Sequence, residues 1–179
     1  TERLERQFAV NVTGPHRLAR AVLPSMREVE QGRIITLSST LAEVALPGTG
    51  AYAASKAALA SLTDALRAEV AQYGIAVLQV VPGPVETQFR TRAMNEVEAL
   101  PRTAAYDTVY DWLDDWNAFG GGFATTAPET VASAILNAAT CTDPAPRTSV
   151  GTVARASQYV RYLPTGIRDW LVRVLMRLA

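Results

Sequence analysis

The chain has 179 residues, of which 49% are hydrophobic and 19% are charged, and its formal net charge is zero. This length suits one globular domain with a sizeable core, and the balanced charge without long runs of one sign argues against nucleic acid as a partner. The single cysteine, Cys141, rules out a disulfide framework and suits a reducing, cytoplasmic location. No apolar run reaches the length of a membrane span, and no metal site is predicted.

Residues 1–30 form the first predicted helix, because apolar residues recur at nearly helical intervals while Arg and Glu occupy the other face. Gly14 and Pro15 interrupt this run and predict a kink or a weakened turn, since proline has no N–H to donate. Asn11 comes just before the interruption. It is either an ordinary helix asparagine that bonds nearby backbone or a residue with a function.

A short β-branched run at residues 33–38 predicts a buried strand, and Ser39 stands at its C-terminal end. After a loop with one proline and two glycines, residues 52–72 are rich in Ala and Leu and predict a helix. Tyr52 and Lys56 are four apart, so they share a face near the start of that helix. A serine at a strand end beside such a pair lies where open α/β sheets place their ligands.

These three side chains have the chemistry for moving a proton. A free tyrosine has a pKa near ~10 and is a poor base at neutral pH. An ammonium one helical turn away is expected to lower the pKa of Tyr52 and suit it to exchange a proton with an alcohol or carbonyl oxygen. Ser39 can donate a hydrogen bond to that oxygen. The alternative is an ordinary helix tyrosine beside a solvated lysine.

In this chain, Ser39 lies thirteen residues before Tyr52, and Tyr52 begins the pattern Tyr52-x-x-Ser55-Lys56. This arrangement resembles the active site of the short-chain dehydrogenase/reductase family. Asn11-Val-Thr-Gly14 resembles the family's helix motif for a fourth catalytic residue. Pro82-Gly-Pro-Val-Glu-Thr87 resembles the loop after the sixth strand, which holds the nicotinamide end of the cofactor. These motifs follow the family's order and span about half of the chain.

The resemblance implies an oxidoreductase that uses NAD or NADP to interconvert an alcohol and a ketone or aldehyde. Tyr52 would be the general acid/base, and Ser39 would orient the substrate oxygen. Lys56 would lower the pKa of Tyr52 and bond the nicotinamide ribose, while Asn11 would maintain a proton relay. Such enzymes act on small molecules and commonly form dimers or tetramers through paired helices, so a homodimer or homotetramer is expected.

The loop at residues 82–87 follows a second predicted buried strand, residues 75–81, where backbone groups can reach a ligand. By the resemblance to the family, the backbone of Val85 would bind the carboxamide of the nicotinamide. Thr87 offers its hydroxyl to the amide or a phosphate, and it is equally an N-cap for the next helix. The expected cofactor-binding residues are Tyr52, Lys56, Pro82, Gly83, Val85 and Thr87.

The implied fold is a Rossmann-like, doubly wound parallel sheet with strand order 3-2-1-4-5-6-7. The chain is expected to supply strands 5–7 with their flanking helices, because no Gly-x-x-x-Gly-x-Gly phosphate loop follows a strand. The choice between NAD and NADP cannot be made from this portion. A competing interpretation is a non-enzymatic remnant or interaction module that does not bind the cofactor as it stands.

Residues 1–153 are interpreted as this domain portion, with 88–126 as a substrate-covering lid. The lid is rich in aromatic residues, which favours an apolar substrate, and Gly120–Gly122 would be its hinge. The alternative is that these aromatics are the core of two small helices. Residues 127–142 predict a helix and 148–153 a short third strand.

Residues 154–179 are interpreted as an amphipathic helical extension. Within it, residues 166–179 show a wide apolar face with a tryptophan and a charged stripe that is mainly arginine. A basic amphipathic helix with Trp can lie on a membrane surface, which would make the protein membrane-associated. The alternative is that the helix packs on its own domain or on a second subunit.

Overall fold

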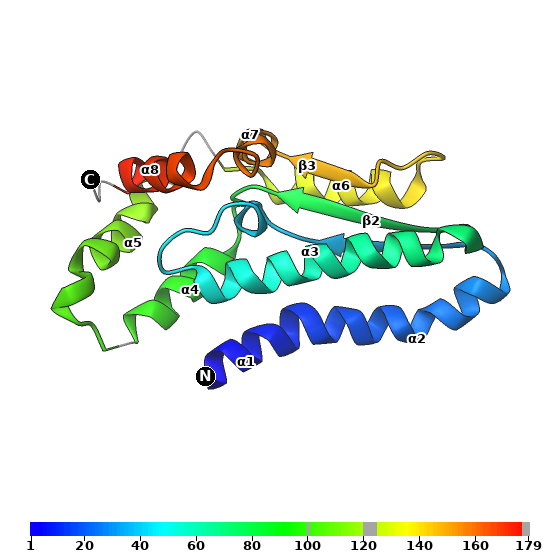
Figure 1. The fold of residues 1–179 in the computed structure, drawn as a ribbon, viewed down its shortest axis with the longest axis horizontal. Coiled ribbons are helices and arrows are strands. Elements are labelled where there is room, and N and C mark those ends of the chain that lie inside the picture. Colours follow the sequence, from blue (N-terminus) through cyan, green and yellow to red (C-terminus); the bar gives the residue numbers. More distant parts are fainter. Residues whose placement is uncertain (100, 120–124, 177–179) are drawn as a thin grey trace.

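The computed structural model describes residues 1–99, 101–119 and 125–176, and its centre is a three-stranded parallel sheet (Figure 1). The strands are β1 (Gly32–Leu37), β2 (Ile75–Pro82) and β3 (Arg147–Val150), in the order β1-β2-β3. Leu37 pairs with Val80 and Val150 pairs with Pro82, so the carboxyl ends of the strands lie at one edge. The expected α/β fold with parallel strands is confirmed. The assignment to strands 5–7 of the family sheet stays a prediction.

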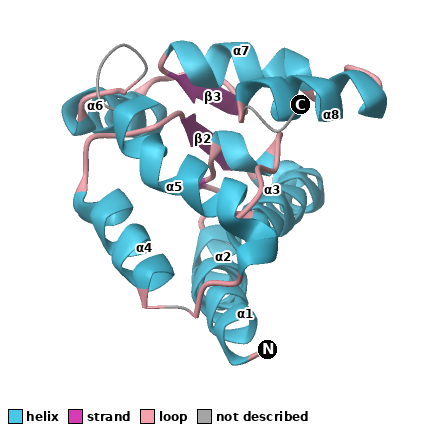
Figure 2. Ribbon diagram, turned by 90° about the vertical axis from the view of Figure 1, so that its left-hand side faces the viewer, coloured by secondary structure: helices cyan, strands magenta, loops and turns pink. Residues whose placement is uncertain are grey.

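The described residues form eight α-helices: α1 (Glu2–Phe8), α2 (Gly14–Glu28), α3 (Gly50–Val70), α4 (Gln88–Glu98), α5 (Asp107–Phe119), α6 (Pro128–Thr140), α7 (Thr152–Val160) and α8 (Thr165–Leu175). Helices α2 and α3 run together along one face of the sheet, and α6 lies on the other (Figures 1 and 2).

The core forms on both faces of the central strand β2, whose side chains are buried almost throughout. On one face, Val77 packs with residues of α2 and α3. On the other face, Leu78 and Val80 pack with Val131 of α6 and Val150 of β3. A strand covered on both faces has a continuous apolar sequence, which is why residues 75–81 could be predicted as a buried strand.

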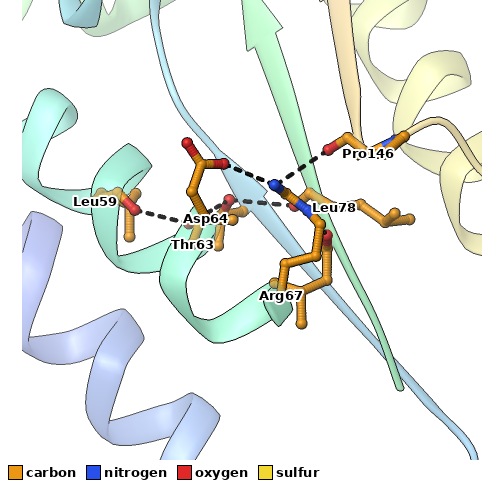
Figure 3. Close-up of polar contacts among 8 residues, drawn as sticks. Leu59, Thr63, Asp64, Arg67, Leu78 and Pro146 are labelled. Carbon is orange, nitrogen blue, oxygen red and sulfur yellow. Dashed lines mark hydrogen bonds and ion pairs between the residues drawn. The ribbon is translucent and has the colours of Figure 1, made fainter. Parts of the chain in front are cut away.

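Polar contacts fix helix α3 on the sheet (Figure 3). The Thr63 hydroxyl lies 3.1 Å from the Thr36 hydroxyl of β1, which donates to the Leu78 carbonyl at 3.2 Å. One turn later, the Arg67 Nε donates to the Val77 carbonyl at 2.8 Å. These bonds hold the helix in register with β1 and β2, so the position of its first turn at the carboxyl edge of the sheet is fixed as well.

The predicted element boundaries hold within a few residues, and two glycines explain where the chain turns. Gly74 has φ +64°, in the left-handed region, and ends the helical segment before β2. Gly151 has φ +90°, and a Cβ there would lie 2.3 Å from the Thr126 hydroxyl. The expected strand over 148–153 is therefore too long, because Gly151 ends β3 and caps α7, which begins at Thr152.

A buried carboxylate joins the loop after β1 to β3, the strand at the opposite edge of the sheet. The Glu43 side chain is 4% exposed and forms ion pairs with Arg147 at the start of β3 and with Arg161 just after α7. Burial makes such pairs sensitive to the loss of one partner. The pairs therefore tie the loop after Ser39 to two other elements.

Candidate functional site

The structure brings Ser39 and Tyr52 together across the loop that separates them. Ser39 follows β1 in an extended conformation, and its hydroxyl accepts a hydrogen bond from the Leu41 N–H at 3.2 Å, which caps a short 3-10 turn. Tyr52 lies on the first turn of α3 and is half-buried. A hydrogen bond with the Ser39 side chain reaches its phenol. The two hydroxyls thus share one place at the carboxyl edge of the sheet.

Lys56 lies one turn further along α3, on the same face. Its Nζ donates to the Leu37 carbonyl at the end of β1, at 2.8 Å. The same Nζ lies 5.8 Å from the centre of the Tyr52 ring. The ammonium therefore belongs to the group of side chains around Tyr52, but its hydrogen bond goes to the strand end.

Burial shifts the pKa of both groups in the protein without ligand. It raises the pKa of Tyr52, because the charged phenolate loses hydration, and the hydrogen bond with Ser39 offsets part of that rise. It lowers the pKa of Lys56 for the same reason. The expectation that Lys56 lowers the pKa of Tyr52 is thus not met here. Desolvation of Tyr52 is the larger effect, and the Lys56 ammonium is itself desolvated and bonded to the Leu37 carbonyl.

Asn11 lies on a π-helical turn, Ala9–Thr13, between α1 and α2. The expected kink thus takes the form of a π turn: the Gly14 N–H donates to the Ala9 carbonyl five residues back, and Pro15 has no N–H to continue the α pattern. The Asn11 Nδ2 donates to the Ser55 hydroxyl at 3.0 Å.

Ser55 is a site residue to which the sequence analysis gave no role. Its hydroxyl is fully buried, accepts from Asn11 and donates to the Tyr52 carbonyl at 2.7 Å. The π turn is therefore bonded to the turn of α3 that carries Tyr52. The available signal was its position, three residues after Tyr52 on the face that packs against the first helix.

The loop after β2 packs tightly where it leaves the sheet. Pro82 is the last residue of β2, and the Gly83 N–H donates to the Val150 carbonyl at 3.1 Å. A Cβ at Gly83 would lie 3.3 Å from the Val153 Cβ and 3.4 Å from the Ala154 nitrogen. Glycine is thus suited to the close approach of α7, a structural reason for this residue beside any ligand contact.

The other two loop residues predicted to bind cofactor, Val85 and Thr87, make hydrogen bonds with the protein's own backbone. Val85 forms an isolated parallel bridge with Thr126, which brings the end of the 88–126 segment back to this loop. The Thr87 hydroxyl accepts from the Phe89 N–H at 3.3 Å, so the interpretation of Thr87 as an N-cap is confirmed. Their contacts with a cofactor stay predictions.

Phe89 is a second neighbour of Tyr52 that the sequence did not indicate. The two rings lie 5.3 Å apart between centroids and are tilted by 47°. Phe89 is 59% exposed, at the start of α4. One wall beside the Tyr52 ring is therefore aromatic and open to solvent.

The segment 88–126 contains helices α4 and α5 in the described residues. Leu113 of α5 is buried and packs over Gly48, in the loop between Ser39 and Tyr52. This contact places α5 over the same loop. The expected hinge at 120–122 and Phe123 lie outside the described residues, as do the side chains of Trp116 and Phe119.

A groove of about 630 Å³ runs along β1 beside helix α2 and reaches Asn11 and Lys56. Just after β1, the Ser38 hydroxyl is buried and has no hydrogen-bond partner among the described residues. Among all the residues that the structure describes, no group of three or more His, Cys, Asp or Glu side chains could hold a metal ion.

Comparison with known proteins gives a consistent result. Residues 1–98 match the family described as short chain dehydrogenase. A dehydrogenase/reductase SDR family protein 7-like from Anopheles gambiae is 33% identical over 94% of this chain and 48% of its own length. A short-chain dehydrogenase structure from Streptomyces avermitilis superposes with a TM-score of 0.72 at 30% identity, over 99% of this chain and 61% of that one.

A third comparison concerns a structure with a bound cofactor. The gluconate 5-dehydrogenase of Burkholderia cenocepacia, in complex with NADP and tartrate, has a TM-score of 0.60 and 27% identity over 76% of this chain and 49% of that one. The chain spans about a third to a half of the length of the curated relatives it matches first.

Proposed function

This chain belongs to the short chain dehydrogenase family, and on that basis we propose that it carries the proton-transfer part of an oxidoreductase site. The reaction is the interconversion of an alcohol and a ketone or aldehyde with NAD or NADP. The observation that supports this most is the convergence of the Ser39 and Tyr52 hydroxyls and the Lys56 ammonium at the carboxyl edge of the sheet.

In this proposal Tyr52 moves the proton. Its phenol gives a proton to the carbonyl oxygen of the substrate on reduction and takes the alcohol proton on oxidation. The Ser39 hydroxyl holds that oxygen and also stabilises the phenolate through its hydrogen bond to Tyr52. The bond from Asn11 to Ser55 fixes the turn of α3 on which Tyr52 lies.

The residues present fit one end of a dinucleotide. The buried Ser38 hydroxyl has no hydrogen-bond partner among the described residues, Lys56 offers a cation, and the loop at 82–87 offers backbone groups. These groups suit the amide and ribose hydroxyls of a nicotinamide nucleoside. When bound, that group supplies or accepts the hydride. The sequence contains no glycine-rich loop for the pyrophosphate.

We further propose that the substrate is apolar next to its reacting oxygen. Phe89 offers an exposed aromatic wall beside the Tyr52 ring. The segment 88–126 would act as the cover, since Leu113 packs over the loop that joins Ser39 to Tyr52. Closing such a cover excludes water from the reacting atoms.

The second candidate is an interaction module without activity, which does not bind the nucleotide. Titration of the protein with NADH and NADPH, followed by nucleotide fluorescence, separates the two. The enzyme proposal predicts saturable binding of at least one nucleotide and its oxidation on addition of apolar ketones or aldehydes. Absence of binding for both nucleotides would favour the interaction module.

The proposed assembly is a homodimer or homotetramer built through the long helices. Exposed apolar side chains on the first helices and on α3 support it: Leu4, Val10, Leu18 and Leu62 are 46%, 64%, 67% and 39% exposed. Static light scattering at micromolar concentration should give at least twice the monomer mass. A monomer mass would reject the assembly and leave the site proposal intact.

A further inference from the structure

Helix α8 turns its apolar face away from the protein. Arg168 and Val172, four residues apart, are half-buried, and Met176, a further four along, is 2% exposed, so this row faces the body of the domain. The neighbouring row on the helix surface is exposed, although it is the more apolar one. Its members Ile167, Trp170, Leu171, Val174 and Leu175 are 46%, 59%, 37%, 48% and 50% exposed.

This row has the i, i+3, i+4, i+7 spacing of one continuous helix face. An amphipathic helix at the surface of a domain normally buries such a face. Scattered exposed apolar residues need no explanation, but a contiguous group of five with a tryptophan marks an interaction surface. Some partner of matching chemistry is therefore needed to cover α8.

The charge around this face indicates the partner. Residues 144–179 contain six arginines and one acidic residue, Asp169, within a chain whose formal charge is zero, and two of these arginines, Arg147 and Arg161, are ion-paired with Glu43. Arg173 is exposed beside the apolar row. Two further exposed aromatics, Tyr159 at 69% and Tyr162 at 78%, come just before α8. Tryptophan, tyrosine and arginine around an apolar helix face are the side chains that favour the boundary between lipid headgroups and acyl chains.

The size of the face argues against a second copy as its main partner. Eleven helical residues span about 16 Å, and a helix is about 10 Å wide, which gives a footprint of roughly 160 Å². A stable protein interface buries about 800 Å² on each partner. Insertion at a membrane surface needs a depth of only about 5–10 Å, which one helix face can supply.

We propose that α8 binds the surface of an anionic lipid bilayer, lying in the plane of the membrane with Trp170 and its apolar neighbours among the headgroups. The exposed Arg173 then lies near the lipid phosphates. Within the described residues, no helix is long and apolar enough to cross a membrane. The proposed binding weakens with salt, because part of it is electrostatic.

The test is flotation of the protein with phosphatidylcholine vesicles that contain or lack phosphatidylserine. We expect the protein to bind the phosphatidylserine vesicles and to bind them less when salt is added. Binding should also shift the tryptophan emission to the blue, a shift that the Trp170→Phe variant lacks. The Trp170→Ser/Val174→Ser variant should bind at least about tenfold more weakly, because two apolar side chains leave the bilayer. Arg173→Gln should lose about fivefold, the effect of one surface charge.

The matched control is Leu136→Ser, which removes an equally exposed apolar side chain (64% exposed) from α6. It should bind vesicles like the unaltered protein. Failure of the unaltered protein to bind phosphatidylserine vesicles would overturn the proposal, and so would an equal loss in Leu136→Ser. Conversion of a dimer to a monomer by the double variant, with vesicle binding unchanged, would assign the face to a second copy instead.

Discussion

Replacing Ser55 with alanine tests the link between the π turn and the catalytic helix. The change removes a fully buried hydroxyl that accepts from the Asn11 amide at 3.0 Å and donates to the Tyr52 carbonyl at 2.7 Å. The carbonyl lies within α3 and keeps its helical partner, so the main loss is at Asn11, whose half-buried amide loses its acceptor.

The expected size of the effect follows from these contacts. Leaving a buried polar group without a partner costs about 1–3 kcal/mol, and alanine regains about 0.5 kcal/mol in helix propensity. We therefore expect the free energy of unfolding to fall by about 1.5 kcal/mol. With a typical urea m-value of about 2 kcal/mol/M, the denaturation midpoint should fall by about 0.7 M.

The matched control is Ser61→Ala, an exposed serine on the same helix, for which alanine should leave the midpoint unchanged or raise it slightly. A double-mutant cycle of Ser55→Ala with Asn11→Ala should give a coupling energy of about 1 kcal/mol. Equal midpoints for Ser55→Ala and the unaltered protein, or a coupling energy of zero, would refute the reasoning.

Three further predictions concern charge, protonation and backbone strain. Glu43→Gln should lower the free energy of unfolding in urea denaturation by about 3 kcal/mol, because two arginines lose a carboxylate that is 4% exposed. As a control, Asp114→Asn removes a carboxylate from an exposed ion pair and should lower the free energy of unfolding by less than about 1 kcal/mol. Ser39→Ala removes a hydrogen bond that favours the phenolate of Tyr52, so ultraviolet titration should show this phenol ionising at higher pH; a shift to lower pH would contradict the assignment. Gly151→Ala should destabilise by about 2–4 kcal/mol in thermal unfolding, because φ is +90° and the new Cβ meets a threonine hydroxyl; unchanged stability would mean that the turn adapts.

Local patterns in the sequence predicted most of the fold. The buried strand at 75–81 and the helix at 52–72 were found because an apolar run and an Ala-rich run are set by neighbours along the chain. The end of β3 was misplaced because Gly151 acts through a contact with Thr126, which lies 25 residues earlier. Contacts of this kind leave no periodic signal.

The candidate site divides in the same way. The resemblance indicated Ser39 and Tyr52 from motif spacing, and the structure brings their hydroxyls together. It included Ser55 in the motif without giving it a role, and it did not indicate Phe89. The proximity of these two residues to Asn11 and Tyr52 depends on how helices pack. The pKa of Tyr52 was predicted with the wrong sign, because an argument from spacing includes the neighbouring charge but not the loss of hydration on burial.

The central claim, that Tyr52 carries the proton, is tested most directly by Tyr52→Phe in the protein with its cofactor. Turnover and nucleotide binding are measured side by side. The account predicts a loss of turnover of about 10²–10⁴-fold, the usual contribution of a general acid/base, with nucleotide affinity nearly unchanged. A Tyr52→Phe variant that turns over at the rate of the unaltered protein would contradict the account.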